Sequence, residues 1–183
     1  MTTVLIGAGG HAKVAYEIAK QSNINIDGFI DPKVLSFNEL KKYDDENFFD
    51  FYFLGVGGVT VSQLENRNLL YKNYKKKSCP LTLLSTHAFV SESSVLGAGT
   101  LVSHNVVIQS GATIGENVII NTGSIVEHDA VIGDGAHIGP GAIILGGAQV
   151  GCETMIGAGA VILPGQIVDA KTLVPSLTRY RND

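Results

Sequence analysis

The pattern of hydrophobic positions changes near residue 80 and divides the chain into two parts. In the first part, apolar runs at 4–6, 24–30 and 51–54 alternate with segments whose apolar residues recur at helical spacing. Alternating strands and helices predict a small parallel α/β domain, Rossmann-like, over residues 1–80. One helix is expected to follow a glycine-rich turn near residue 10, and a second is expected from about Val59 to Tyr74.

In the second part, an aliphatic residue stands at every sixth position. A period of six fits neither a helix, with a period of 3.6, nor a lone strand, with a period of 2, but it fits short strands separated by bends. Three such strands close a triangular coil of eighteen residues, and successive coils stack about 4.8 Å apart. We therefore predict a parallel β-helix over residues 81–183. The inward series is Leu84, Val90, Leu96, Val102, Ile108, Ile114, Ile120, Val126, Ile132, Ile138, Ile144, Val150, Ile156, Ile162, Val168 and Val174.

Small residues and glycines accompany this series. A mostly small residue, such as Ala112, Ala130 or Ala148, stands two positions before each aliphatic one, although Gln166 breaks that pattern. Glycines near the expected bends can adopt corner conformations that β-branched residues resist. The glycines expected in this role are Gly97, Gly99, Gly115, Gly133, Gly135, Gly139, Gly141, Gly151, Gly157 and Gly159.

Composition and charge narrow the classes of partner. The 183 residues are 45% hydrophobic and 16% charged, which is typical of a globular protein. A net charge of −4 argues against nucleic acid or an anionic membrane as partner. No run approaches the roughly 18 apolar residues of a membrane span, and the N-terminus lacks the cationic start of a secretory signal. Cys79 and Cys152, without CxxC spacing, are expected to be free thiols in a reducing cytoplasm.

The turn GAGGHA at 7–12 has the features of a phosphate-binding turn. Gly7, Gly9 and Ala12 satisfy the pattern GxGxxA, in which phosphate approaches backbone amides at a helix N-terminus. Asp31, at the end of the second expected strand, could accept hydrogen bonds from ribose hydroxyls. The domain is too short for both halves of a dinucleotide fold, which favours one nucleotide over an NAD dehydrogenase. A tight turn without any ligand is the alternative.

The turn GAGGHAKV followed by a β-helix that carries NTGSIVEHDAVIGDGAHIGPGA resembles the hexapeptide-repeat nucleotide-sugar acetyltransferases. Within this family it is similar to the bacillosamine-pathway N-acetyltransferases of UDP-4-amino-4,6-dideoxy sugars, with perosamine N-acetyltransferases and sialic acid O-acetyltransferases as relatives. The resemblance implies a left-handed β-helix, a homotrimer and acetyl-CoA as cosubstrate without any metal. It also implies acetyl transfer to the 4-amino group of a nucleotide-linked sugar at a site between subunits.

The same resemblance assigns roles to individual residues. His128 matches the general base, and Asp129 matches the carboxylate that holds its tautomer. Gly146 matches the amide that receives the acetyl carbonyl, and His137 and Ala158 match positions near acetyl-CoA. The residues expected near the sugar nucleotide are Gly9, Gly10, His11, Asp31, Gly55 and Asn121. The residues that could meet the CoA phosphates, or could be solvated charges near the end of the chain, are Lys171, Arg179 and Arg181.

The period of eighteen tests part of this assignment independently. Gly146 stands eighteen residues after His128, so the two are predicted to lie one above the other in adjacent coils. Acyl transfer needs such a pair, because one group removes a proton while the other stabilises the oxyanion. His137 is nine residues from His128, half a coil away, so these two residues could share a site only across a subunit boundary. The sequence leaves open whether Asp129 or Glu127 orients the ring.

Other functions remain as alternatives. Gamma-class carbonic anhydrases bind zinc on a similar β-helix through histidines five residues apart, but no two histidines here have that spacing, so no metal site is expected. A β-helix that is only a scaffold, as in ice-binding or spacer solenoids, is another alternative, but ice-binding solenoids need a flat threonine array and the outward positions here show none. O-acetylation of a sugar acid, N-acetylation of a GDP- or TDP-linked amino sugar, and a non-catalytic nucleotide-sensing trimer stay open.

Overall fold

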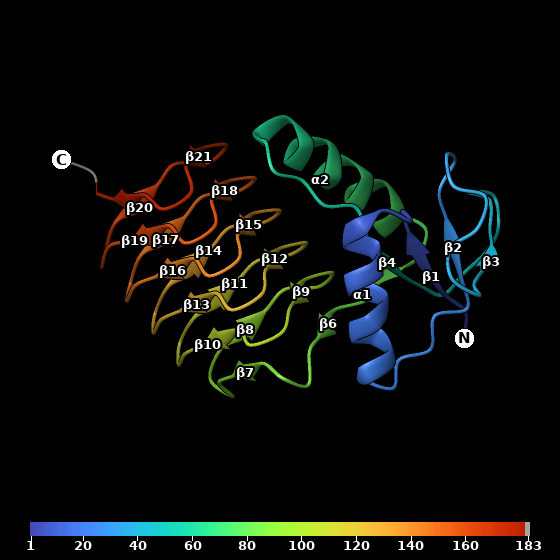
Figure 1. Ribbon diagram of the computed structural model, residues 1–183, viewed down its shortest axis with the longest axis horizontal. Coiled ribbons are helices and arrows are strands. Elements are labelled where there is room, and N and C mark those ends of the chain that lie inside the picture. Colours follow the sequence, from blue (N-terminus) through green and yellow to red (C-terminus); the bar gives the residue numbers. More distant parts are fainter. Residues whose placement is uncertain (182–183) are drawn as a thin grey trace.

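The computed structural model describes residues 1–181 and contains an α/β domain that packs against a long parallel β-helix (Figure 1). The predicted β-helix range ends at residue 183, and residues 182–183 lie outside the described part. The two predicted architectures, a small parallel α/β domain and a β-helix, are both confirmed.

The N-terminal domain is a five-stranded parallel sheet with the order β3-β2-β1-β4-β5. The strands are β1 (Thr3–Ile6), β2 (Gly28–Ile30), β3 (Lys41–Lys42), β4 (Phe51–Leu54) and β5 (Cys79–Pro80), and the helices are α1 (Gly10–Gln21) and α2 (Val61–Lys75). The helix predicted from Val59 begins two residues later because Thr60 caps it. The Thr60 hydroxyl accepts a hydrogen bond from the Gln63 amide, and the Gln63 side chain accepts one from the Val59 amide.

Helix α1 lies between the sheet and the β-helix. It buries a small-residue face formed by Ala12, Ala15 and Ala19 together with Ile18. This face belongs to one apolar cluster with the sheet residues Leu5 and Phe29 and with outward residues of the β-helix. The β-helix members of that cluster are Leu83, Leu101 and Ile119. A continuous core therefore fixes the N-terminal domain on one face of the β-helix.

The β-helix consists of two-residue strands that form three parallel sheets. The first sheet is β22-β19-β16-β13-β10-β7, the second is β20-β17-β14-β11-β8 and the third is β21-β18-β15-β12-β9-β6. Paired residues are eighteen apart, as in Ile125 with Ile143, which confirms the predicted coil length. The strands are β6 (Leu83–Leu84), β7 (Phe89–Val90), β8 (Val95–Leu96), β9 (Leu101–Val102), β10 (Val107–Ile108), β11 (Thr113–Ile114), β12 (Ile119–Ile120), β13 (Ile125–Val126), β14 (Val131–Ile132), β15 (His137–Ile138), β16 (Ile143–Ile144), β17 (Gln149–Val150), β18 (Met155–Ile156), β19 (Val161–Ile162), β20 (Ile167–Val168), β21 (Leu173–Val174) and β22 (Arg179–Tyr180).

The predicted inward series forms a buried column from Val102 to Val174. Its first member, Leu84, is in register with the inward Val102 but is 38% exposed, while its neighbour Leu83 is fully buried. Leu84 belongs to the first coil, where no earlier coil covers the column. Leu83 instead packs on the opposite side of the strand, in the cluster that contains α1.

The predicted corner role holds for only some of the glycines. Gly99, Gly135, Gly141 and Gly159 have left-handed φ angles of 65–74°, as expected. The other six glycines do not, and a Cβ built on each would lie 2.3–2.6 Å from an atom of the next coil. Those six are needed for close stacking of the coils and not for backbone conformation: Gly97, Gly115, Gly133, Gly139, Gly151 and Gly157.

Candidate active site

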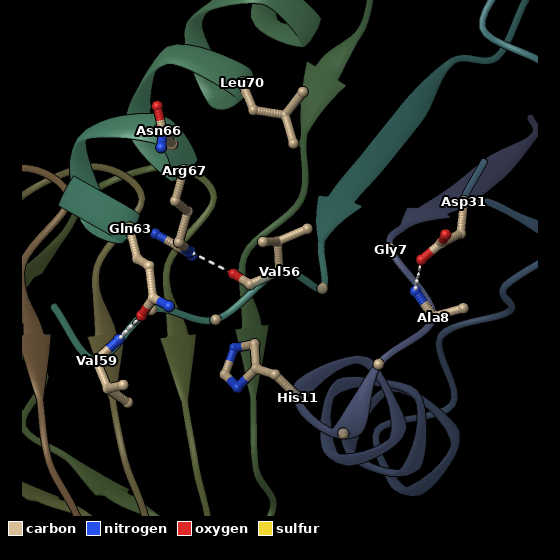
Figure 2. A pocket seen from close by; sticks show the side chains of 15 residues that line it. Gly7, Ala8, His11, Asp31, Val56, Val59, Gln63, Asn66, Arg67 and Leu70 are labelled. Atoms are coloured by element: carbon tan, nitrogen blue, oxygen red, sulfur yellow. Dashed lines mark hydrogen bonds between the residues drawn. The ribbon is translucent and has the colours of Figure 1, made fainter. Parts of the chain in front are cut away.

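A cavity of about 650 Å³ lies where two glycine-rich turns meet at the C-terminal ends of β1 and β4 (Figure 2). The first turn leads from β1 into α1, and the second leads from β4 towards α2. Five residues expected from the sequence line this cavity together: Gly9, Gly10, His11, Asp31 and Gly55. Ligands of parallel α/β sheets bind at this edge, outside the carboxyl ends of the strands.

Backbone amides in both turns are free to bind an anion. Gly9 caps α1 without a side-chain hydrogen bond, so the positive end of the helix dipole faces the cavity. Among the described residues, no acceptor binds the amides of Gly9, Gly10, Gly57 or Gly58. This arrangement suits a phosphate group.

The carboxylate of Asp31 holds the first turn in place. Its Oδ2 accepts a hydrogen bond from the Ala8 amide at 3.0 Å, which Figure 2 shows, and its Oδ1 accepts one from the Lys33 amide at 2.8 Å. The ribose contact expected from the sequence would have to use the remaining lone pairs of these oxygens.

The second turn is held in place by hydrogen bonds from the buried side chain of Arg67, a residue that was not predicted from the sequence. Arg67 is only 1% exposed, and its Nε donates to the Val56 carbonyl at 2.8 Å (Figure 2), while its Nη1 donates to the Asn117 carbonyl in the β-helix. Burial lowers the pKa of Arg67 to about 9. Because α2 carries polar residues all round, its sequence has no periodicity that would mark Arg67 as buried.

His137 also supports the second turn, and both of its ring nitrogens are engaged. Its Nδ1 donates to the Gly58 carbonyl at 2.6 Å, so its Nε2, 3.0 Å from Asn121 Nδ2, is the acceptor. The ring is 5% exposed, and burial lowers the pKa of His137 to about 4. Burial likewise lowers the pKa of His11 to about 3, and its Nε2 has no hydrogen-bond partner among residues 1–181. Both rings are therefore neutral near pH 7.

A second cavity, of about 460 Å³, follows the outward edge of the β-helix beside the first one. It brings together Asn121, His137 and Ala158, three residues expected in the site, and it shares Val59 with the first cavity. The rest of its lining is largely apolar and includes Met155, Leu173 and Pro175.

His128 lies on the bend between β13 and β14, outside the linings of both cavities. Its Nδ1 lies 2.9 Å from Asp129 Oδ2, and the two side chains are 64% and 73% exposed. The hydrogen bond to Asp129 is the main cause that raises the pKa of His128, while Glu127 adds only a longer-range charge effect. Of the two carboxylates that the sequence left open, Asp129 makes the hydrogen bond to the ring.

Gly146 lies beside this histidine in the next coil. A Cβ on Gly146 would stand 2.6 Å from His128 Nε2, so the ring occupies the space that any other residue would fill. The Gly146 amide belongs to a repeating position, two residues past each inward aliphatic. No amide at this position makes a backbone hydrogen bond in the described chain, and Pro140 and Pro164 also occupy it. A proton acceptor and a free N–H donor therefore lie side by side.

Two family models match the chain. The model of the PglD N-terminal domain matches residues 3–63, and the model of the bacterial transferase hexapeptide (six repeats) matches residues 111–146 and 129–164. PerB from Caulobacter crescentus, solved with CoA and GDP-perosamine, is 31% identical with a TM-score of 0.86. The match covers 96% of this chain and 86% of that one. The chain belongs to the hexapeptide-repeat nucleotide-sugar acetyltransferases.

Further members of this acetyltransferase family have the same structure. The PglB acetyltransferase domain from Neisseria gonorrhoeae FA1090, solved with acetyl coenzyme A, is 28% identical with a TM-score of 0.85, and the match covers 96% of this chain and 88% of that one. A histidine-to-asparagine variant of perosamine N-acetyltransferase from Caulobacter crescentus has 28% identity, a TM-score of 0.89 and coverages of 96% and 86%. Comparison with curated protein sequences gave no match. The predicted family, the left-handed β-helix and the acetyltransferase class are confirmed.

The chain keeps the expected site residues in two groups. Asn121 and Ala158 lie on bends that follow β12 and β18, whereas His128 and Gly146 lie on bends that follow β13 and β16, across one face of the β-helix. Lys171 pairs with Glu65 on α2 at 2.8 Å. Within residues 1–181, no group of three or more His, Cys, Asp or Glu side chains could hold a metal ion, and no helix has the length and apolarity to cross a membrane.

Proposed function

We propose that this enzyme transfers the acetyl group of acetyl-CoA to the 4-amino group of a UDP-linked 4-amino-4,6-dideoxy sugar. The proposed substrate is UDP-4-amino-4,6-dideoxy-N-acetylglucosamine, and the product is UDP-N,N′-diacetylbacillosamine. The observation that carries the proposal is the pair formed by His128 Nε2 and the free amide of Gly146. Acyl transfer needs a proton acceptor and an oxyanion donor close together.

The reaction follows from the tautomer of His128. With Nδ1–H donated to Asp129, the Nε2 lone pair is free to take a proton from the sugar amine as the nitrogen attacks the thioester carbonyl. The new C–N bond places negative charge on the carbonyl oxygen, which the Gly146 amide stabilises. The intermediate then collapses, the C–S bond breaks, and the CoA thiolate receives the proton. The products are the N-acetylated sugar and free CoA.

The nucleotide is proposed to bind in the first cavity. Its phosphates would meet the free amides of the two glycine-rich turns. Guanine presents two adjacent N–H donors, which a carboxylate can accept together. Asp31 is the one carboxylate in the described lining of this cavity, and it already accepts two backbone hydrogen bonds. This favours uridine. A GDP-linked amino sugar is the second candidate, because PerB was solved with GDP-perosamine.

The complete site is proposed to form between neighbouring subunits of a homotrimer. His128 lies outside both cavities of its own chain, so His128 of the partner subunit would reach the sugar amine near Asn121. Acetyl-CoA would lie along the apolar second cavity past Ala158. The free thiols of Cys79 and Cys152 agree with a cytoplasmic location.

The test is release of CoA thiol from acetyl-CoA with UDP-, GDP- and TDP-linked 4-amino sugars, with sialic acid as the O-acetylation control. We expect activity with the UDP sugar that is largely abolished in His128→Ala. Full activity of that variant would exclude the proposed base. A mixture of the His128→Ala and Asn121→Ala variants can be unfolded together and then refolded, so that the subunits exchange. This should restore part of the activity if the site is shared, because some interfaces then combine an intact His128 with an intact Asn121. If the enzyme acetylates sialic acid, and no nucleotide shifts its thermal unfolding, O-acetylation of a sugar acid would replace the proposed reaction.

A further inference from the structure

Gly111 lies one coil below Asp129, on the bend that precedes β11. Its φ angle is 70°, and a Cβ built there would stand 2.6 Å from Asp129 Oδ1. Carbon and oxygen atoms do not approach so closely without a shift. The Asp129 carboxylate therefore occupies space that exists only because residue 111 has no side chain.

The carboxylate is fixed from its other side as well. The Asp129 backbone has a left-handed φ of 59°, and its amide donates to the Ser110 carbonyl at 3.1 Å. With the backbone held in this way, Oδ2 reaches His128 Nδ1 at 2.9 Å while Oδ1 lies over Gly111. A small displacement of Oδ1 would move Oδ2 out of line with the ring nitrogen.

Backbone conformation alone does not require glycine at this position. The left-handed conformation recurs every six residues along the β-helix, and six of these positions carry a side chain. They are Asn105, Asn117, Asp129, Glu153, Lys171 and Leu177. At Gly165, two coils above Asp129 in the same row of bends, φ is 67° and no atom of residues 1–181 lies within 4 Å of an added Cβ. Gly111 differs from Gly165 by its contact with Asp129 and not by its conformation.

We infer that Gly111 is a positioning residue, which holds the Asp129 carboxylate in line with His128 by leaving room for it in the coil below. This inference rests on the proposed function, in which His128 is the base. The charged groups that act on the ring are Asp129 and Glu127, and Gly146 faces it from the coil above.

The test compares Gly111→Ala with Gly165→Ala in the full-length protein. Both variants place a methyl group on a left-handed backbone, so they share the conformational cost, but only the first pushes against Asp129. The pKa of His128 is measured by NMR titration of its ring protons. We expect that pKa to fall towards its ordinary value in Gly111→Ala and to stay raised in Gly165→Ala. We also expect kcat to fall roughly tenfold in Gly111→Ala, a part of what a general base contributes.

A double-mutant cycle with Asp129→Ala sharpens the result. Without the carboxylate there is nothing for the new methyl group to meet, so Gly111→Ala should then have no more effect than Gly165→Ala. Gly111→Asn is the second variant if Gly111→Ala does not fold, because Asn105 and Asn117 adopt the same conformation. An unchanged His128 pKa in both Gly111 variants would overturn the inference. A changed pKa with an unchanged pH profile of the rate would uphold it and overturn the role of His128 as base.

Discussion

The imidazole Nε2 of His128 faces Gly146 in the next coil so closely that one added methyl group would stand 2.6 Å from it. The strand pairing of β13 with β16, eighteen residues apart, creates this contact. The same stacking leaves the Gly146 amide without a partner among the described residues, so the β-helix repeat itself supplies the proposed oxyanion donor. The chemistry proposed for this acetyltransferase thus depends on the coil period as much as on the residues.

Gly146→Ala should abolish most activity while leaving the fold intact. The φ angle of Gly146 is not left-handed, so alanine fits the backbone there, but its methyl group would displace the His128 ring. We expect kcat to fall about 10²-fold or more, the range for loss of an oxyanion contact or a base. The free energy of unfolding, measured by thermal unfolding, should fall by no more than about 1 kcal/mol. Normal kcat with a folded protein would show that Nε2 has no part in the reaction.

The pH profile of kcat/KM should show an acid limb set by His128. Because Asp129 raises the pKa of His128, the limb should be centred above the ordinary value of 6.5, and activity should be lost as the pH falls through it. In Asp129→Asn the limb should move to lower pH, since the neutral amide no longer stabilises the charged ring, and the maximal rate should fall. A limb that does not move in this variant would contradict the assigned pairing. Glu127→Gln is the matched control and should shift the limb less.

His137→Leu should weaken binding of the nucleotide sugar without changing the acid limb. The substitution leaves the Gly58 carbonyl without its donor and releases Asn121, which frees the second glycine turn. An unpaired buried polar group costs about 1–3 kcal/mol, so we expect KM for the nucleotide sugar to rise about tenfold. KM and the pH profile, measured together, separate this positioning role from proton transfer. A shifted acid limb would instead indicate that His137 titrates in the reaction.

Ala158→Leu should raise KM for acetyl-CoA by about tenfold or more, because the larger side chain would fill part of the second cavity. Ala170 provides the control. It stands at the same position of its hexad, two residues past Val168, and is exposed away from both cavities. Ala170→Leu should therefore leave both KM values unchanged. Equal effects of the two substitutions would place acetyl-CoA elsewhere.

The folded protein should lose stability below about pH 6.5. His137 titrates at about 4 when folded and near 6.5 when unfolded, so the unfolded state binds more protons between these values. The free energy of unfolding is therefore not reduced by His137 above pH 6.5, and it declines as the pH falls towards 4. Between pH 6.5 and 5 the decline is about 2 kcal/mol. Burial of His11 acts in the same direction. Urea unfolding at several pH values measures the slope, which should be shallower in His137→Gln.

Most of the fold could be predicted because the hexad repeat is regular and local. The aliphatic at every sixth residue fixed which side chains point inward, and the period of eighteen correctly placed Gly146 beside His128. The exposure of Leu84 could not be predicted, because a repeat pattern carries no information on where stacking begins. The glycine error arose because one residue type serves both left-handed bends and close packing between coils.

The contacts between the two units could not be predicted. Arg67 donates to Asn117 fifty residues later, and His137 reaches Gly58 across 79 positions, and neither pair has a periodic signal in the sequence. Gly111 was missed for a related reason. Its importance comes from the carboxylate above it, and its sequence position resembles that of many other bend glycines.

The amide position that recurs at the bends has a wider consequence. Pro140 and Pro164 have no N–H there, and the amides of Glu116 and Thr122 donate to side chains, but other bends offer a free donor like that of Gly146. The β-helix therefore presents several similar candidate oxyanion sites along its axis. Which of them becomes the reaction centre depends on where a histidine and an adjacent glycine are introduced. A shift of that pair by eighteen residues would translate the chemistry by one strand spacing, about 4.8 Å, without any change of fold. Such a scaffold can adapt to acceptors of different length by small, discrete steps.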